Sequence, residues 1–255
     1  EAWLPKDPIK YGDRLVTAGV LSQGQLNHLV QDVEGEIDEA VNFAEESPDP
    51  KPEDALDGVF APMSTIPDTV VVEPDQGDRL LSLGKAINEA LTQGMERDPG
   101  IFVLGEDVAT LGGDFGVTRG LLEKYGPERA FDTPLSETAI IGVSVGAAIQ
   151  GQHPVAEIMF SDFLGCAMDQ IINQAAKFHY MFGEQVNIPL VIRTAYGAGI
   201  SASSQHSQSL ESLFTHIPGL KVVMPASPYD AKGLMTTALL DNNPVMFFEH
   251  KLLYG

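Results

Sequence analysis

The chain has 255 residues, of which 44% are apolar, 20% are charged and one is cysteine. This length suffices for one large domain, or for one domain with an appendage, and for burial of a real core. The formal charge of −21, from 15 basic and 36 acidic residues, argues against nucleic acid as a partner, because phosphate binding needs a basic face. A single cysteine excludes a disulfide scaffold and a cysteine-built zinc site. No apolar stretch approaches the roughly 18 residues that cross a membrane, so we expect a cytoplasmic protein with no membrane partner.

The acidic charge is concentrated in the first part of the chain. Residues 1–78 contain 18 acidic and 4 basic side chains, whereas residues 79–255 contain 18 and 11. Apolar residues recur at spacings of three and four over residues 26–44, which predicts an amphipathic helix with acids on its other face. Ser22 followed by Gln25 predicts a capped start of this helix.

Prolines mark the end of the helical part. The run from Ser47 to Pro52 contains three prolines and predicts a helix break. Residues 53–78 contain three more prolines, which is typical of a segment crossing a surface. We therefore predict a helical segment over residues 1–62, a linker over residues 63–78 and a separate domain over residues 79–255.

Helix and strand patterns alternate from Arg79 onward. Short continuous apolar runs predict strands, and amphipathic or small-residue-rich stretches predict helices between them. This alternation is typical of a parallel sheet that is covered on both faces. The predicted fold class is α/β, a three-layer domain with a central, mainly parallel sheet, preceded by the helical acidic segment. The expected strands are 101–104, 154–160, 189–194, 221–224 and 245–249, and the expected helices are 80–97, 137–150 and 164–182.

Three polar or glycine-rich clusters follow strand signals, at the edge where parallel sheets bind ligands. They contain Glu106, Phe163 and His206, respectively. The glycines within residues 112–116 match neither the dinucleotide fingerprint nor the phosphate-binding loop, so a tight surface turn explains them equally well. His206 lies among small and polar residues, which suits a proton donor or acceptor, although surface histidines are common.

Glu137 is the most informative of these residues. It opens a predicted helix, and the fourteen residues that follow it carry no charge. A carboxylate at a helix N-terminus is stabilised by the helix dipole and is usually a cap. Alternatively, a carboxyl group in such an apolar setting can exchange a proton with a bound base. Asp169 and Lys177, eight residues apart on a predicted helix, suit an ordinary ion pair.

Collinear strings after residue 79 carry a family resemblance. They include "FVLGEDVATLGGDFGVTRGL", "YGPERAFDTPLSE", "QHSQSLE" and "DNNPVMFFEHKLLYG". They resemble the pyrimidine-binding domain of the beta subunit of the thiamine-diphosphate-dependent first component of 2-oxo acid and acetoin dehydrogenase complexes. The earlier strings "KDPIKYGDRLVTAGVL" and "FAEESPDPKPEDALDGVFAP" resemble the C-terminal tail of the alpha subunit of the same component. Because the first residue is Glu1 rather than Met, we expect a piece of an alpha–beta fusion.

The resemblance implies an activity, cofactors and partners. The activity is oxidative decarboxylation of a 2-oxo acid such as pyruvate, or cleavage of acetoin, with transfer of the acyl group to lipoamide. The cofactor is thiamine diphosphate with Mg²⁺, which the family anchors on a Gly-Asp-Gly motif that this sequence lacks. A diphosphate-binding, alpha-type domain is therefore an implied partner, together with a lipoyl acyltransferase and further copies in a homo-oligomer.

The resemblance also implies roles for individual residues. Glu137 matches the glutamate that hydrogen-bonds the ring nitrogen of the cofactor's aminopyrimidine, and Phe163 matches the aromatic residue that stacks on this ring. His206 matches the histidine implicated in passing the acyl group to lipoamide. Leu135 and Glu106 match residues beside the cofactor. Glu106 and Asp169 match acids in a proton path between two active sites. A K⁺ site in some members corresponds to the backbone at Leu190, Ala238, Asp241 and Asn243.

Two alternatives remain. A transketolase-like or deoxyxylulose-phosphate synthase activity shares the pyrimidine-binding domain but does not use lipoamide, and the alpha-type tail argues against it. A non-catalytic subunit-interaction module is the other alternative, in which the acidic segment and the sheet edge dock partner domains.

Overall fold

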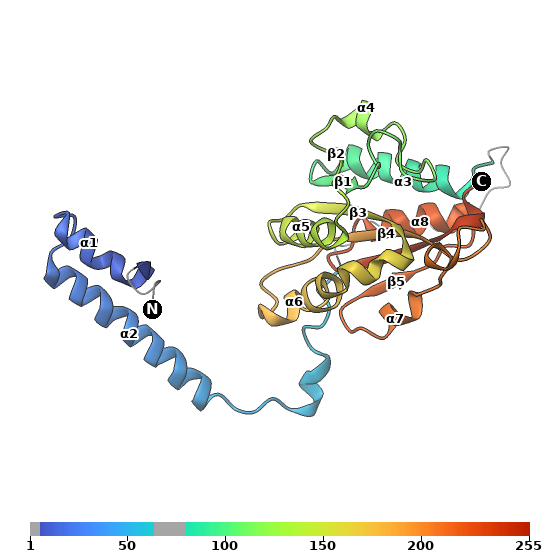
Figure 1. Ribbon diagram of the computed structural model, residues 1–255. Helices are drawn as coiled ribbons and strands as arrows, with labels where there is room; N and C mark the ends of the chain where they lie inside the picture. Colours follow the sequence, from blue (N-terminus) through green and yellow to red (C-terminus); the bar gives the residue numbers. More distant parts are fainter. Residues whose placement is uncertain (1–5, 64–79) are drawn as a thin grey trace. The chain divides into compact units, whose positions relative to one another are not determined.

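The computed structural model describes residues 6–63 and 80–255, which form two compact units (Figure 1). One unit ends at Ala55 and the other begins at Leu56. No helix among the described residues is long and apolar enough to cross a membrane.

The first unit is helical, as its sequence predicts. It contains α1 (Tyr11–Thr17) and α2 (Gln23–Glu46). Ser22 caps α2 in the predicted reciprocal way, since its Oγ accepts from the Gln25 N–H at 3.2 Å and the Gln25 Oε1 accepts from the Ser22 N–H at 2.9 Å. Helix α2 ends where Ser47 donates back to the Phe43 carbonyl, one residue before Pro48. No residue of α2 is buried.

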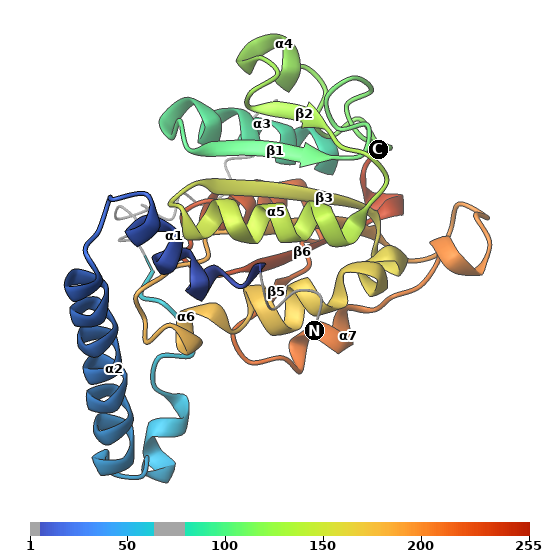
Figure 2. The same ribbon diagram turned by 60° about the vertical axis from the view of Figure 1, so that its left-hand side comes forward.

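A six-stranded, fully parallel sheet forms the centre of the second unit (Figure 2). Its strand order is β2-β1-β3-β4-β6-β5. The five predicted strands are all present, with ends shifted by at most two residues, and the sixth strand, β2, was not predicted. The strands are β1 (Ile101–Gly105), β2 (Ala130–Asp132), β3 (His153–Phe160), β4 (Val191–Tyr196), β5 (Lys221–Val223) and β6 (Val245–His250).

Helices cover both faces of this sheet, so the predicted three-layer α/β fold is confirmed. Helices α3 (Leu83–Arg97) and α8 (Pro228–Ala238) pack together on one face. On the other face α5 (Glu137–Ile149) packs against β3 and lies in front of the sheet in Figure 2. The shorter helices are α4 (Leu121–Tyr125), α6 (Phe178–Met181) and α7 (Glu211–Thr215).

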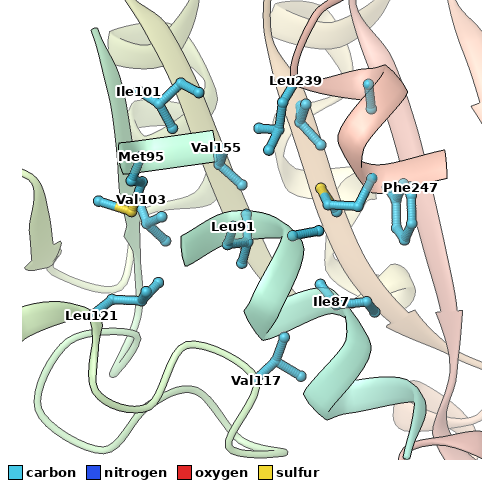
Figure 3. Packing of buried hydrophobic residues seen from close by; sticks show 14 of the residues in the cluster. Ile87, Leu91, Met95, Ile101, Val103, Val117, Leu121, Val155, Leu239 and Phe247 are labelled. Atoms are coloured by element: carbon cyan, nitrogen blue, oxygen red, sulfur yellow. The ribbon is translucent and has the colours of Figure 1, made fainter. Parts of the chain in front are cut away.

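The core follows the two expected periodicities. Ile87, Leu91 and Met95 recur every four residues on α3 and point toward the sheet (Figure 3). Alternate strand residues face opposite layers, so that on β6 Phe247 contacts the α3 cluster whereas Phe248 contacts the α5 cluster. Both faces of the sheet are therefore buried, which explains why its strands are continuous apolar runs.

The predicted long helix over residues 164–182 is wrong. The segment is instead a 3₁₀ turn (Ser161–Ala167), a π-helical turn (Gln170–Ala175) and the short α6. The Ala176 N–H bonds the Ile171 carbonyl five residues back, which widens the helix at this point. Apolar spacing over this length does not distinguish such a break from a continuous helix.

Helix α8 had no counterpart in the prediction, although its start carries two sequence signals. The Ser227 Oγ caps the helix by accepting from the Asp230 N–H at 3.1 Å, and Pro228 occupies the first helical position. These signals indicate a helix that the weak periodicity of residues 228–238 does not reveal.

We expect Gly219→Ala to lower the free energy of unfolding by about 3 kcal/mol or more. Gly219 has φ of +94°, and a Cβ there would lie 2.0 Å from the Ala176 carbonyl oxygen. The matched control is Gly126→Ala, where φ is +80° and nothing lies within 4 Å of the added Cβ, so only the backbone strain of about 1–3 kcal/mol applies. Urea unfolding measures both, and equal losses would show that the contact with Ala176 is unimportant.

Candidate functional site

The predicted site residues gather at the carboxyl edge of the sheet. Glu106 directly follows β1, Glu137 follows β2 after four residues, Phe163 follows β3, and His206 lies in the connection after β4. Because neighbouring parallel strands end at the same edge, these side chains from four crossover units meet there.

Three rings form the centre of this edge, and we call Phe160, Phe163 and His206 the ring cluster. The centroid of the His206 ring lies 4.7 Å from that of Phe160 and 5.2 Å from that of Phe163, both edge to face. The two phenyl rings are 6.0 Å apart and also edge to face. The imidazole is therefore held on two sides by aromatic rings, which restricts its orientation.

Glu137 keeps its carboxyl group free of internal hydrogen bonds. It is half-buried at the first residue of α5, and within the described ranges no group hydrogen-bonds its carboxyl oxygens. The hydroxyl of the next residue, Thr138, donates to the Cys166 carbonyl at 2.5 Å and fixes the start of α5 to the segment that carries Phe163. The carboxyl group is thus placed by its backbone and remains available to a ligand.

Glu106 is an acidic neighbour of this carboxyl group. Glu106 is only 8% exposed, and burial raises its pKa, with further increases from the charges of Glu137, Asp107 and Asp114. Burial likewise raises the pKa of Asp114, Asp107 raises it further, and the charge of His206 acts in the opposite direction. Glu106 can therefore hold a proton at a higher pH than an exposed glutamate, and it lies close enough to Glu137 for the two charges to interact.

The loop after β1 is tied to the end of β2. The Asp132 carboxylate accepts from the Ala109 N–H at 2.7 Å and from the Thr110 hydroxyl at 2.5 Å. Burial acts to raise the pKa of Asp132, but these hydrogen bonds outweigh it and hold the pKa below its usual range. The loop that begins with Glu106 is thereby fixed beside the segment that leads to Glu137.

Two predicted residues lie on the surface of the chain. Leu135 is 85% exposed, an unusual position for a leucine two residues from a candidate catalytic group. Asp169 is exposed and accepts from the Asn173 amide at 2.7 Å and from Gln170 at 3.2 Å. The described residues place no contact between Asp169 and Glu106, so a proton path between them remains a prediction.

The predicted K⁺ residues lie at the opposite, amino-terminal edge of the sheet, before β4 and β6. One Asp241 oxygen accepts from the Lys221 ammonium at 2.6 Å, and the other accepts from the Asn243 N–H and side-chain amide. The Asn243 Oδ1 accepts from the Ala61 N–H at 2.7 Å. A cation there would be bound by backbone carbonyl groups. The Leu190 carbonyl already accepts from the Val245 N–H, and the Ala238 carbonyl accepts from the Asp241 N–H. The K⁺ site remains a prediction.

A buried group of charges beneath the edge was missed by the sequence interpretation. Arg193 on β4 is 1% exposed and donates to both Glu249 oxygens on β6, at 2.8 and 2.7 Å, and to Glu157 on β3. The Tyr254 hydroxyl also donates to Glu249, at 2.9 Å. We call these four residues the ion cluster. Single charged residues inside three apolar strand runs were the signal that could have revealed it.

The ion cluster and the ring cluster are connected through aromatic side chains. The Tyr254 ring stacks on Phe115 at 4.6 Å, and Phe115 meets Phe160 edge to face at 6.2 Å. Burial raises the pKa of Glu157 against the opposing effect of Arg193, and burial together with Glu249 raises the pKa of Tyr254 well above its usual value. The ion cluster is therefore buried and is linked to the ring cluster through Tyr254 and Phe115.

The transketolase pyrimidine-binding domain family matches residues 80–255. The chain belongs to this family. It is 55% identical over 187 residues to the acetoin:2,6-dichlorophenolindophenol oxidoreductase subunit beta of Cupriavidus necator, covering 69% of this chain and 55% of that protein. It is 51% identical over 175 residues to the 2-oxoisovalerate dehydrogenase subunit beta of Bacillus subtilis, covering 69% and 54%. The predicted beta-subunit pyrimidine-binding domain is confirmed, and the chain spans about half the length of these relatives.

Solved structures agree on the fold. A split gene transketolase, described as an inactive beta4 tetramer, superposes with a TM-score of 0.53 at 24% identity, over 68% of this chain and 52% of that one. Transketolase from Leishmania mexicana superposes with a TM-score of 0.54 at 16% identity, over 68% of this chain and 26% of that one.

We expect Arg193→Met to destabilise the domain by about 3–5 kcal/mol at neutral pH, because it leaves Glu157 and Glu249 buried without a counter-charge. Burial raises the pKa of Glu157 and Arg193 opposes this, so without Arg193 the Glu157 carboxyl group binds a proton more tightly in the folded than in the unfolded chain, and the variant should regain stability as the pH falls. Denaturant unfolding across pH measures this. Lys124→Met, which removes an exposed partner of Glu96, is the control and should change little at any pH.

Proposed function

We propose that this chain supplies the aminopyrimidine half of the active site of a thiamine-diphosphate-dependent dehydrogenase that acts on a 2-oxo acid or on acetoin. The observation that carries the proposal is the Glu137 carboxyl group, which has no hydrogen bond to any described residue and lies at the carboxyl edge of the sheet together with Phe163, His206 and Glu106. A carboxyl group for a ring nitrogen and an aromatic face for the ring are the groups that an aminopyrimidine requires. The donor set therefore fits the cofactor.

Glu137 would hold and move a proton. Its carboxyl group would hydrogen-bond the ring nitrogen of the aminopyrimidine and exchange a proton there. When bound, thiamine diphosphate supplies a ring that accepts the electron pair released at the substrate carbonyl carbon. Burial raises the pKa of Glu106, and the charge of Glu137 raises it further, so the two groups interact electrostatically. Glu106 would take up that proton or return it.

The rings would position the reactants. Phe163 would stack on the aminopyrimidine, and the exposed Leu135 would be covered once cofactor and partner domain are in place. His206, held by Phe160 and Phe163, would assist transfer of the acyl group to a lipoyl acceptor.

The other half of the site would come from a diphosphate-binding, alpha-type domain. Among the described residues no group of three histidine, cysteine, aspartate or glutamate side chains could hold a metal ion. Mg²⁺ would be bound mainly by that partner, as the family resemblance implies. A lipoyl acyltransferase would receive the acyl group. Relatives named as beta subunits of an acetoin oxidoreductase, a 2-oxoisovalerate dehydrogenase and a pyruvate dehydrogenase support the existence of a partner subunit. The lipoyl acyltransferase and the homo-oligomer are what the family resemblance implies.

The test is reduction of 2,6-dichlorophenolindophenol by the complete enzyme, that is, this chain together with its diphosphate-binding domain, thiamine diphosphate and Mg²⁺. Pyruvate, branched-chain 2-oxo acids and acetoin are offered separately. We expect turnover with one of these classes and a loss of about 100-fold or more in Glu137→Gln, because the amide cannot exchange the proton.

Glu123→Gln on α4 is the matched control and should leave turnover unchanged. Circular dichroism establishes that the variants are folded. Turnover of Glu137→Gln within a few-fold of wild type would refute the role of Glu137, and a folded, cofactor-loaded enzyme with no turnover on any substrate would refute the proposed reaction.

A further inference from the structure

Lys251 is a buried cation at the candidate site that no step so far uses. It directly follows β6 and opens the turn Lys251–Leu253 at the carboxyl edge, yet it is only 4% exposed. Arg193, the other fully buried cation of the domain, bonds two carboxylates. Within the described residues Lys251 has no carboxylate in ion-pair contact. A buried ammonium group without such a partner is costly, so its presence requires another reason.

The contacts of Lys251 are with the ring cluster. Its Nζ donates a hydrogen bond to the backbone carbonyl of His206 and lies 5.1 Å from the centroid of the Phe160 ring. The same Phe160 ring meets the His206 imidazole edge to face at 4.7 Å. The ammonium group therefore fixes both the main chain of His206 and the ring against which the imidazole packs.

The segment that carries His206 is attached to the rest of the domain mainly at Gln208, whose carbonyl accepts from the Gly197 N–H at 3.0 Å and from the Ser161 hydroxyl at 3.3 Å. Within the segment the Ser207 hydroxyl donates to the Ser203 carbonyl at 2.6 Å. Ser201 and Ser203 have positive φ values of 58° and 67°, which strains the backbone of residues that are not glycine. Residues 198–201 are exposed, and the neighbouring Gln208 is attached at its side chain by the Asp162 carboxylate at 2.8 Å. His206 itself is attached at two points, at its carbonyl, which accepts from Lys251, and at its ring, which packs against Phe160 and Phe163.

Charge makes this attachment strong. A hydrogen bond from an ammonium group is about twice as strong as one between neutral groups. Burial lowers the pKa of Lys251, and the negative charge of Asp162 acts in the opposite direction. Asp162 also has one buried oxygen, Oδ2, without a hydrogen-bond partner among the described residues. Its negative charge acts on the Lys251 ammonium group.

We propose that Lys251 is a positioning residue for acyl transfer: its ammonium group holds the His206 backbone so that the imidazole stays against Phe160 and Phe163. The inference rests on the proposed function, because it assigns His206 to the step after the substrate has been cleaved. Lys251 would then matter for delivery to the lipoyl acceptor and much less for the earlier steps, which depend on Glu137.

Two assays on the complete enzyme separate these steps. Reduction of 2,6-dichlorophenolindophenol reports substrate cleavage without a lipoyl acceptor, and transfer to a lipoyl domain reports delivery. We expect Lys251→Met to lower lipoyl transfer by about 10-fold or more while dye reduction stays within about threefold of wild type. Lys232→Met, which removes a lysine on α8 that is paired with Glu89, should leave both rates unchanged.

The other outcomes of these two assays contradict either the role of Lys251 or the proposed function. If wild type reduces the dye, then lipoyl transfer that is unchanged in Lys251→Met, or an equal loss in both assays, would overturn the inference and leave the proposed function intact. No thiamine-dependent dye reduction by wild type would instead overturn the proposed function. If Lys251→Met does not fold, Lys251→Arg decides: a ratio of transfer to dye reduction near that of wild type supports positioning through the N–H donor, and a lowered ratio overturns it.

Discussion

The hydrogen-bonded charges around Arg193 hold together the three central strands on which the candidate site depends. Arg193 on β4 bonds Glu157 on β3 and Glu249 on β6 inside a sheet whose other layers are apolar. Such a cluster is stabilising only when every partner is present, because each charge alone would be buried without compensation. Tyr254 and Phe115 continue this support to Phe160, the ring against which His206 packs. The buried charges around Arg193 thus contribute to the position of the His206 imidazole through the chain of ring contacts that ends at Phe160.

The parallel sheet explains why the reactive groups come from distant parts of the sequence. Glu106, Glu137, Phe163 and His206 each follow a different strand, and only the strand order brings them to one edge. The site therefore contains two acids, Glu106 and Glu137, whose surroundings differ. Glu106 is buried and holds its proton more tightly, whereas the Glu137 carboxyl group has no hydrogen-bond partner in the part of the chain that the structure describes, and the exposed Leu135 is two residues away. This pairing suits a site that relays a proton to a ligand covered by a second domain.

The sequence predicted the layered fold, the α2 cap and the edge at which the site lies, because periodicity and capping are local signals. It did not predict the break at Gln170–Ala175, which depends on hydrogen bonds that spacing does not reveal. The roles of Glu137, Phe163 and His206 came from the family resemblance, since the residues alone left Glu137 open as a helix cap. Arg193 and Lys251 were missed because their importance lies in contacts with residues far away along the chain: Glu157 and Glu249 are 36 and 56 positions from Arg193, and His206 is 45 positions from Lys251. Only the strand pairing places these partners together.

The central claim is that Glu137 controls proton exchange on the aminopyrimidine ring. The most direct measurement is the rate at which the thiazolium carbon of bound thiamine diphosphate exchanges its proton for deuterium, followed by quenched-flow NMR on the complete enzyme without substrate. The account predicts that exchange is about 100-fold slower or more in Glu137→Gln than in wild type. Equal exchange rates in two folded, cofactor-saturated proteins would contradict it.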